Sequence, residues 1–279
     1  MIDYTGSRAR RRTAHYLFVL LIWVICLVYF FPILYMFITS LKHETDVVPP
    51  KLFFTPTLEN YRTVLLSSDI VSHIVNSAII TLSSMVLCIF LGVPTAYAIV
   101  FGKLKKPDSL FFWFLSTTLL PPVAVIIPVF LIFKNLHLLD TRWGMIIMYV
   151  GANVPIVIWM VRSFLKDIPA ELLEAADIDG ATRIRSFFKI VLPLARSGII
   201  SSALLVFIFV WNEFFFAINL TYVNASPIPV YMASYMTQEG LFWAKLSAIS
   251  TVTVLPPLIL GWISHKSIVR GLMMGAVKG

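Results

Sequence analysis

The chain has 279 residues, of which 59% are hydrophobic and only 13% are charged, and its formal net charge is +8 at pH 7. Soluble domains carry about 25% charged and roughly 45–50% apolar residues, so this composition excludes an ordinary soluble protein and predicts an integral membrane protein, with one domain over residues 1–279. The basic residues follow membrane topology, as described below, so we expect no nucleic-acid partner. Cys26 and Cys88 lie in apolar runs, which predicts neither a disulfide framework nor a metal site.

Six apolar stretches are long enough to cross a membrane, because about 20 helical residues span roughly 30 Å of hydrocarbon. We therefore predict an all-α integral membrane protein with six transmembrane helices. The first stretch is too long for the core of a signal peptide and lacks a small-residue cleavage site, so we expect it to be retained. The predicted spans are residues 16–40, 74–101, 110–133, 143–164, 198–222 and 246–263.

The distribution of Lys and Arg predicts the orientation of these spans, because loops on the cytoplasmic side carry an excess of both residues. With the N-terminus in the cytoplasm, 16 of the 22 Lys and Arg residues fall inside and 6 fall outside. The opposite orientation would invert this ratio. We therefore expect both termini and the loop 165–197 to be cytoplasmic.

Two features of the first half of the chain bear on function. The outer loop 41–72 contains Pro49, Pro50 and Pro56, and it can carry a short surface helix around residues 58–66 that contacts a partner outside the cell. The third apolar stretch contains Pro121-Pro122 and Pro128 at membrane depth. Such prolines are tolerated where neighbouring helices or water satisfy the freed carbonyls, so they predict either a packing kink or a bend that lines a path.

The loop after the fourth stretch is unusually acidic, since five of the fourteen acids lie within residues 167–179. Pro169 suits the first turn of a helix, where its missing N–H costs nothing. Glu171 and Glu174 then lie near the N-terminus of that helix, where the helix dipole favours negative charge. Gly180 fits the position just past the helix end, where a left-handed conformation is usual.

A second helix is predicted to follow, with Thr182 as its N-cap and Pro193 turning the chain into the fifth span. Its apolar residues recur with helical spacing and predict one stripe docked on the bundle. This stripe comprises Ile184, Phe187, Phe188 and Val191. The prediction is a helix–turn–helix along the cytoplasmic face that contacts another protein.

The spacing Glu174-Ala175-Ala176, three residues, Gly180, nine residues, Ile190-x-Leu192-Pro193 resembles the signature loop of the membrane subunits of ATP-binding-cassette importers. The wider stretch 168–182, the run 211–214 and the tail 270–279 resemble the carbohydrate-uptake branch. The six spans and the lack of a long outer domain are similar to the shorter permease of the maltose-type transport systems.

This resemblance implies that the loop 165–197 holds a coupling helix, which sits in a groove of a cytoplasmic ATPase subunit dimer. The residues expected to serve that contact are Glu171, Glu174, Ala175, Ala176, Asp177, Asp179 and Gly180. The other implied partners are a second, homologous permease subunit, an extracytoplasmic solute-binding protein and membrane lipid. The alternative interpretation is a solvated loop that stabilises the bundle.

Catalytic chemistry is not expected of this chain. The sequence has no Gly-x4-Gly-Lys-Ser/Thr pattern, so we expect ATP and Mg to be bound by the partner ATPase and no cofactor to be bound here. It also lacks a pattern of catalytic or metal-ligating residues that predicts an enzyme.

A substrate pathway is predicted from polar residues inside the apolar stretches, which are rare and often functional. Glu213 is the only acid in the fifth stretch, Trp211 and Asn212 precede it, and Asn219 lies nearer the outside. Asn153 in the fourth stretch is a weaker candidate. An aromatic face with amides and a carboxylate suits a polyhydroxylated solute. The alternative is that Glu213 and Asn212 bond to other helices and hold the bundle together.

The sequence thus predicts a multi-pass permease of the bacterial inner membrane that imports a sugar, oligosaccharide or polyol by alternating access. One alternative keeps the importer class and changes the cargo to a phosphate ester or another small polar solute. The other alternative is a membrane scaffold subunit whose acidic loop recruits a different cytoplasmic partner.

Overall fold

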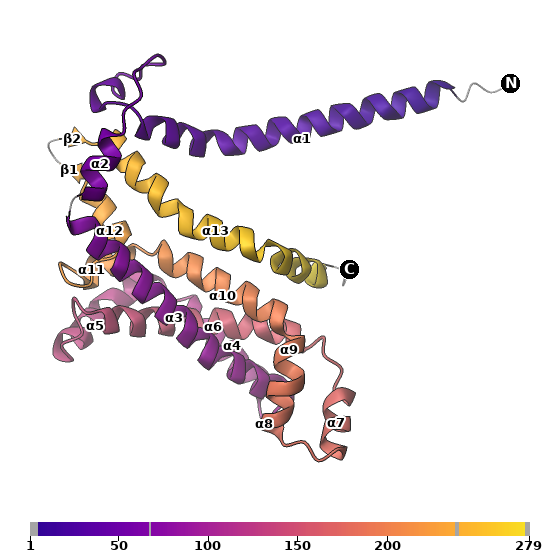
Figure 1. Ribbon diagram of the computed structural model, residues 1–279. Helices are drawn as coiled ribbons and strands as arrows, with labels where there is room; N and C mark the ends of the chain where they lie inside the picture. The colour runs from indigo at the N-terminus through magenta and orange to yellow at the C-terminus, as the bar shows by residue number, and fades with distance from the viewer. Residues whose placement is uncertain (1–4, 67, 238–239, 277–279) are drawn as a thin grey trace. The chain divides into compact units, whose positions relative to one another are not determined.

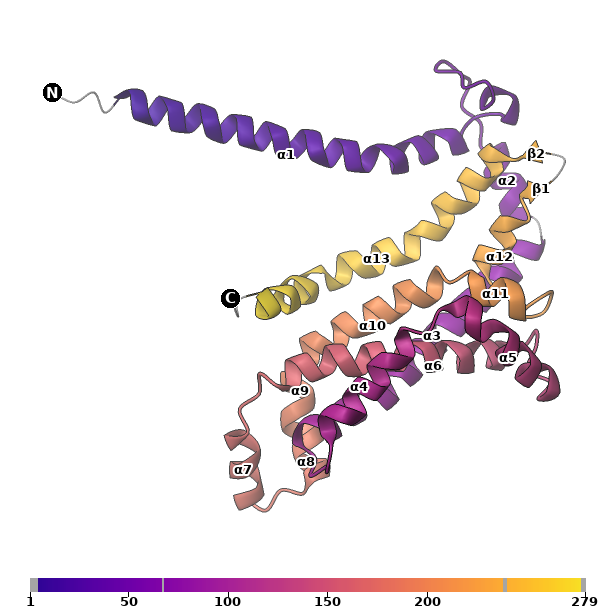
Figure 2. The same cartoon turned by 180° about the vertical axis from the view of Figure 1, so that it is seen from behind.

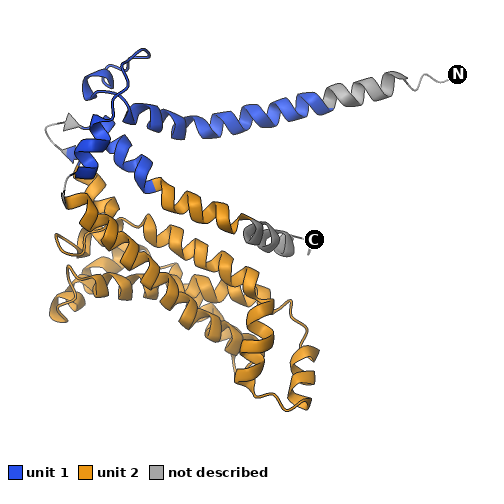
Figure 3. Ribbon diagram, in the orientation of Figure 1, with its two compact units in different colours: residues 1–67, 235–253 blue, residues 68–234, 254–279 orange. Residues whose placement is uncertain are grey.

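The computed structural model describes residues 5–66, 68–237 and 240–276, and it describes side chains within residues 15–66, 69–236 and 242–265. The last residues of the tail motif, 277–279, lie outside the described residues. The chain divides into two compact units, one formed by residues 1–67 and 235–253 and the other by residues 68–234 and 254–279 (Figure 3). Whether these units belong to one transmembrane domain stays a prediction.

The first unit contains the long helix α1 (Thr5–Ser40), the short η1 (Glu44–Asp46), α2 (Glu59–Leu66) and the β1–β2 pair (Met236–Thr237 and Gly240–Leu241). The first part of α13 (Trp243–Ala276) completes it. Large apolar side chains are exposed along α1 from Tyr16 to Phe37. A helix that is apolar on all sides needs an apolar environment, so α1 is suited to lipid or to a partner helix.

The loop that follows α1 is folded rather than extended. The Ser40 hydroxyl and the Tyr61 hydroxyl share a hydrogen bond of 2.6 Å. The Asn60 side chain donates to the carbonyls of Ser40 at 2.9 Å and Lys42 at 2.7 Å. These bonds fix α2 against the end of α1, and α2 itself confirms the short helix predicted around residues 58–66.

The second unit is a helical bundle. Its core is formed by α3 (Ser68–Phe101), α6 (Arg142–Leu165) and α10 (Arg196–Trp211), which lie side by side (Figures 1 and 2). The remaining helices are α4 (Pro107–Thr118), α5 (Pro122–Asn135), α7 (Glu171–Ile178), α8 (Arg183–Ser186), η2 (Phe187–Val191), α9 (Leu192–Leu194), α11 (Phe215–Leu220) and α12 (Ile228–Ala233).

A glycine sets the close approach of α3 and α6. A Cβ atom added to Gly92 would lie 2.6 Å from Val157 Cγ1 and 2.8 Å from Val157 Cβ. Val157 and its neighbour Ile158 are fully buried. Because protein interiors are close-packed, a side chain at Gly92 would force these two helices apart.

The described residues contain four helices long and apolar enough to cross a membrane, and up to six spans if each of two bent helix pairs counts as one. The four helices are His15–Ser40, Asp69–Phe101, Arg142–Leu165 and Trp243–His265. The predicted span 143–164 therefore agrees with α6 to one residue at each end. The spans predicted from 74 and 246 begin earlier in the structure, at Asp69 and Trp243.

The third predicted span, 110–133, is wrong as a single helix. It consists of α4 and α5, which meet at an angle of 90°. Pro121 and Pro122 lack the N–H groups that would continue the hydrogen-bond ladder, and Pro122 begins α5, where a missing N–H is tolerated. Pro128 remains inside α5. The chain is therefore broken at the proline pair, and whether this bend lines a path stays a prediction.

The fifth predicted span, 198–222, is also wrong as a single helix. The helix α10 begins at Arg196 and ends at Trp211, and a new short helix, α11, begins at Phe215. The break contains Glu213, whose carboxylate accepts hydrogen bonds from the backbone of the next helix. A side chain that bonds the backbone in this way offers an alternative to the helical ladder.

Candidate functional site

The acidic helix α7 is the first helix in the segment between α6 and α10, and Figure 1 shows it at the end of the bundle. Glu171 and Glu174 lie in its first turn, as predicted. The N-cap is Ala170, so Pro169 precedes the helix and the prediction that Pro169 belongs to its first turn is wrong. The two glutamates face solvent near the positive end of the helix dipole, where a negative charge stabilises the helix.

The end of α7 has the hydrogen bonds of a Schellman motif. The N–H of Ala181 donates to the Ala176 carbonyl at 2.9 Å, and the N–H of Gly180 donates to the Asp177 carbonyl at 3.1 Å. Gly180 has a φ of 76°, in the left-handed region that favours glycine. The predicted turn at Gly180 is confirmed, and it sets the direction in which the chain leaves α7.

The second helical segment begins as predicted, because the Thr182 side chain accepts a hydrogen bond from the Arg185 N–H at 3.3 Å. The predicted apolar stripe is wrong. Ile184 is 72% exposed and Phe188 is 59% exposed, whereas Val191 is buried. Residues 187–191 form a π-helix, whose wider turn shifts the direction of successive side chains away from the period of 3.6 residues.

The outward surface of this loop combines acids with apolar side chains. Asp177 and Asp179 are exposed, as is Ala175 beside them, whereas Ala176 is buried. The two alanines therefore do not share one outward face. The exposed apolar residues are Leu172, Ile178, Ile184 and Phe188. An exposed apolar patch rimmed by charges is typical of a surface that docks another protein.

The second candidate site is the break between α10 and α11. The Glu213 carboxylate accepts hydrogen bonds from the N–H groups of Phe216 at 2.8 Å and Ala217 at 3.2 Å. It also accepts a hydrogen bond of 2.7 Å from the hydroxyl of Tyr149, a residue of α6 that is 2% exposed. Glu213 therefore closes the first turn of α11 and ties the break to α6.

The other predicted pathway residues lie around this break. Trp211 is 5% exposed and stacks on Phe207, with ring centroids 5.5 Å apart. Asn212 is exposed, and its amide donates to the Ile208 carbonyl at 2.8 Å. Asn153 is buried and donates to the Tyr149 carbonyl at 2.9 Å.

Asn219 is the predicted residue farthest along the chain. Its amide donates to the Phe215 carbonyl at 2.6 Å. All three asparagine amides thus bond to a carbonyl four residues earlier on their own helix. Asn153 bonds to the carbonyl of Tyr149 and Glu213 to its hydroxyl. The sequence interpretation missed Tyr149, because an isolated tyrosine in an apolar helix carries no signal of its partner.

A further polar centre, also missed from the sequence, lies between the α5–α6 turn and the α11–α12 loop. The Asp140 carboxylate accepts hydrogen bonds from consecutive backbone N–H groups at distances of 2.9 to 3.3 Å. These donors are Tyr222, Val223, Asn224 and Ala225. Burial raises the pKa of Asp140, but the backbone donors together outweigh it and hold that pKa below its usual value.

The neighbouring residues complete this centre. The Asn76 amide donates to the carbonyls of Asn224 at 3.0 Å and Ser226 at 3.1 Å, and Arg142 Nε donates to Asn76 Oδ1 at 2.7 Å. The loop after α11 is therefore fixed to both α3 and α6. Within the described part of the chain, no group of three or more His, Cys, Asp or Glu residues could hold a metal ion.

The long apolar helices define a multi-pass membrane protein, and the comparisons with known proteins identify its family. Residues 88–269 match the family described as binding-protein-dependent transport system inner membrane component. The match includes the loop with α7 and the break at Glu213. The chain belongs to this family.

Individual relatives extend over nearly the whole chain. It is 35% identical to the probable ABC transporter permease protein y4oR of Sinorhizobium fredii, over 98% of this chain and 99% of that protein. It is 34% identical to the trehalose transport system permease protein SugB of Mycobacterium tuberculosis, over 89% of this chain and 92% of that protein.

Solved structures show the same fold. A chain from a bacterial ABC transporter involved in the import of the acidic polysaccharide alginate matches with a TM-score of 0.78 at 24% identity, over 95% of this chain and 99% of that chain. A chain of the MetNI methionine ABC transporter matches with a TM-score of 0.57 at 16% identity, over 73% of this chain and 96% of that chain. The chain thus has the fold of an ABC transporter permease.

Proposed function

We propose that this chain is a permease subunit of an ATP-driven, binding-protein-dependent importer, with its spans formed by α1, α3, the α4–α5 pair, α6, α10 and α13. Family membership supports the class, and the acidic helix α7 carries the proposal for the mechanism. A short helix closed by a rigid turn at Gly180 transmits a push from a partner without bending. Charge on α7 gives that partner a specific contact.

The partner at α7 is, in this proposal, one subunit of an ATPase dimer that binds ATP and Mg. The coupling contacts are Glu171, Glu174, Ala175, Asp177 and Asp179, while the buried Ala176 and the turn at Gly180 fix the helix on the bundle. Exposed Ile178 and Ile184 add apolar area to the interface. In this proposal both termini and α7 lie in the cytoplasm of a bacterium, as the Lys and Arg distribution predicts.

The remaining partners follow from the same class. A second, homologous permease subunit would cover the exposed apolar side chains of α1, together with membrane lipid. An extracytoplasmic solute-binding protein would deliver the solute at the opposite face. The loop fixed by Asp140 is well suited to such a contact, because its backbone is held by several hydrogen bonds before any partner arrives.

For the cargo we propose a sugar, oligosaccharide or polyol. Relatives with named cargo support this class: SugB, the trehalose/maltose permease MalG of Thermococcus litoralis at 31% identity, and the diacetylchitobiose permease DasC of Streptomyces coelicolor at 27% identity. Carbohydrates present both hydroxyl groups and an apolar C–H face. We propose that exposed Asn212 and half-buried Asn219 contact the hydroxyl groups of the sugar. Both oxygens of Glu213 are already hydrogen-bonded, so its role is to hold the break between α10 and α11 that positions these asparagines.

The proposal is tested with the purified complex in proteoliposomes. ATP is supplied on the side of the membrane that exposes the ATPase, and a panel of sugars, polyols and phosphate esters is tested as cargo. ATP hydrolysis is measured with and without the cognate binding protein. Stimulation by one carbohydrate-loaded binding protein is the expected result. Stimulation only by a non-carbohydrate solute would change the cargo and keep the class, whereas an intact chain that never retains an ATPase would contradict the importer assignment.

A further inference from the structure

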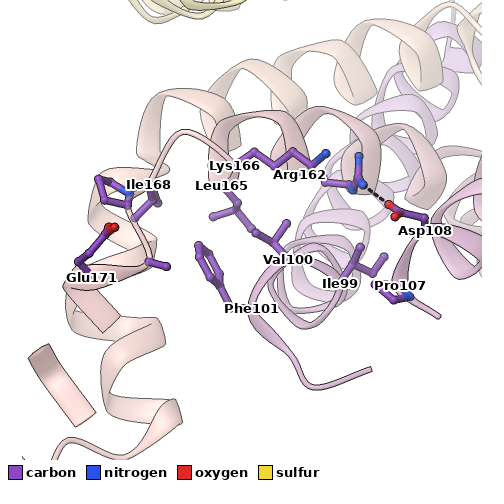
Figure 4. Close-up of a pocket in the computed structure, with 12 residues that line it drawn as sticks. Ile99, Val100, Phe101, Pro107, Asp108, Arg162, Leu165, Lys166, Ile168 and Glu171 are labelled. Atoms are coloured by element: carbon purple, nitrogen blue, oxygen red, sulfur yellow. Dashed lines mark hydrogen bonds and ion pairs between the residues drawn. The ribbon is translucent and has the colours of Figure 1, made fainter. Parts of the chain in front are cut away.

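A cavity of about 690 Å³ lies where the helices α3 and α6 end (Figure 4). Its walls are the last turn of α3, the first turn of α4, the last turn of α6 and the segment 166–171 that leads into α7. This volume falls within the roughly 300–1,000 Å³ of typical small-ligand sites. Apart from Glu171 at its rim, the cavity uses none of the residues assigned above to coupling or to the solute pathway.

The cavity has an apolar floor and a cationic wall. Val100 and Phe101 are half-buried and offer apolar surface to the cavity, whereas Ile99 and Leu165 are buried. Arg162 lies in the last turn of α6, and Lys166 follows directly after the end of this helix, one turn later. Figure 4 shows both side chains on the same wall of the cavity. A ligand that fits this surface carries an apolar part and a negative charge.

The guanidinium group of Arg162 has donors to spare. It lies 4.0 Å from the centre of the Phe111 ring and donates through Nη2 to Asp108 Oδ1 at 2.6 Å. Its Nε is buried and has no hydrogen-bond partner in the part of the chain that the structure describes. Because arginine carries five N–H donors in a planar fork, the ion pair with Asp108 leaves it able to bind a phosphate group as well.

The turn that joins α3 to α4 adds positive charge beside the cavity. Two basic residues, Arg162 and Lys166, and two acids, Asp108 and Glu171, line the cavity itself. Asp167 lies in the segment 166–171, and Lys103, Lys105 and Lys106 lie in the turn. Basic pockets at the inner ends of membrane helices attract anionic lipid headgroups, because the cytoplasmic leaflet is negatively charged.

We propose that this cavity binds the headgroup of an anionic phospholipid from the cytoplasmic leaflet. The phosphate lies at Arg162 and Lys166, and the glycerol backbone rests on Val100 and Phe101. This inference relies on the proposed function for one point, that α7 faces the cytoplasm and the cavity therefore opens at the inner membrane surface. A lipid bound here braces the segment that leads into α7, so coupling responds to the anionic lipid content of the membrane.

The test uses the purified transporter complex in nanodiscs of phosphatidylcholine that contain a fixed fraction of phosphatidylglycerol. Native mass spectrometry counts the phosphatidylglycerol molecules retained when the complex is released. Lys166→Gln is expected to weaken specific retention about tenfold, as loss of a charge-assisted contact implies. Arg162→Lys keeps the charge and loses the planar donor fork, so it is expected to weaken retention by a smaller factor. Arg185→Gln, at an exposed basic residue of α8 outside the cavity, is the matched control and is expected to retain the wild-type number.

Arg162→Lys keeps the positive charge beside Asp108, and Lys166 is exposed, so both variants are expected to fold as the wild type does. Equal retention in both variants and in the control would overturn the proposal. Displacement of phosphatidylglycerol by millimolar inorganic phosphate would also overturn it, since the cavity would then take a free anion. Stimulation of ATP hydrolysis by the binding protein is measured on the same samples, so failure of the importer assignment and failure of the lipid site are read separately.

Discussion

The hydroxyl of Tyr149 donates a hydrogen bond of 2.7 Å to the carboxylate of Glu213, and this bond links two helices at the point where one of them is broken. The same carboxylate accepts the N–H groups of Phe216 and Ala217. One side chain thus ends α10, begins α11 and fixes the break to α6. A carboxylate in the middle of a membrane segment is tolerated here because both of its oxygens are bonded.

Replacing Glu213 by Ala is expected to destabilise the break. The change removes the acceptor for two backbone N–H groups and leaves the buried Tyr149 hydroxyl unpaired, a loss of about 1–3 kcal/mol for the orphaned donor. Tyr149→Phe removes the hydroxyl instead, so the double variant is expected to cost less than the sum of the two single variants. The measurement is the unfolding midpoint of the purified complex in detergent. Strict additivity of the two changes would show that the bond does not form.

Replacing Gly180 by Ala is expected to weaken the turn after α7. No atom lies within 4 Å of the added Cβ, so the cost comes from the backbone at φ 76° alone, about 1–2 kcal/mol for a non-glycine residue. Gly151→Ala is the matched control, because Gly151 also has nothing within 4 Å and lies inside the helix α6. Hydrogen exchange of residues 171–182 is expected to rise for Gly180→Ala only. Equal protection in both variants would contradict the strained turn.

Gly180→Pro is expected to be more damaging than Gly180→Ala, because proline fixes φ near −65° and removes the N–H that bonds to Asp177. Transport by this variant in proteoliposomes is expected to be lost while the helices of the bundle remain folded. Circular dichroism of the same sample serves as the control for folding. Wild-type transport by Gly180→Pro would show that the geometry of this turn is not needed for coupling.

Replacing Gly92 by Ala is expected to separate α3 from α6. The new Cβ would contact Val157 at 2.6 Å, and overpacking of this kind costs about 1–3 kcal/mol. Val157→Ala removes the nearer clashing atom, Cγ1, and leaves Val157 Cβ at 2.8 Å, so the double variant is expected to recover only part of the stability lost by Gly92→Ala. Thermal unfolding of all three variants measures this rescue. An absence of rescue would place the strain of Gly92→Ala elsewhere.

The loop held by Asp140 is expected to remain ordered in mild acid. The folded pKa of Asp140 is lowered, so its ionised form stabilises the fold above the unfolded value of about 3.9, and this stabilisation is lost as the pH falls through the lower folded pKa. The protection factors of residues 222–225, which correct exchange for its intrinsic dependence on pH, are therefore expected to be equal at pH 7 and pH 5. Asp140→Asn is expected to expose the same amides at both pH values. Loss of protection in the wild type between pH 7 and pH 5 would contradict this account.

Local signals in the sequence predicted the parts of the fold that depend on neighbouring residues. The span at α6, the cap at Thr182 and the turn at Gly180 are set by residues within a few positions, and each is present as predicted. The features that depend on distant residues were not predictable. The break at Glu213 needs Tyr149 on another helix, and the backbone donors to Asp140 come from a loop more than eighty residues away.

Two predictions failed for local reasons that periodicity does not capture. The pair Pro121-Pro122 breaks its span by 90°, which is more than the kink expected of a proline within a continuous helix. The π-helix at 187–191 changes the helical period, so Val191 is buried whereas Phe188 and Ile184, one turn before it, are exposed. The roles of the coupling and pathway residues stay predictions, which the proposed substitutions test.

The central claim is that α7 couples this chain to an ATPase, and co-purification of that ATPase with the tagged chain tests it most directly. Glu174→Lys reverses an exposed charge in the first turn of α7, and Glu59→Lys makes the same change at the exposed start of α2. The account predicts that Glu174→Lys reduces the retained ATPase strongly and that Glu59→Lys retains the wild-type amount. Wild-type retention by Glu174→Lys and by Gly180→Pro, with transport intact, would contradict it.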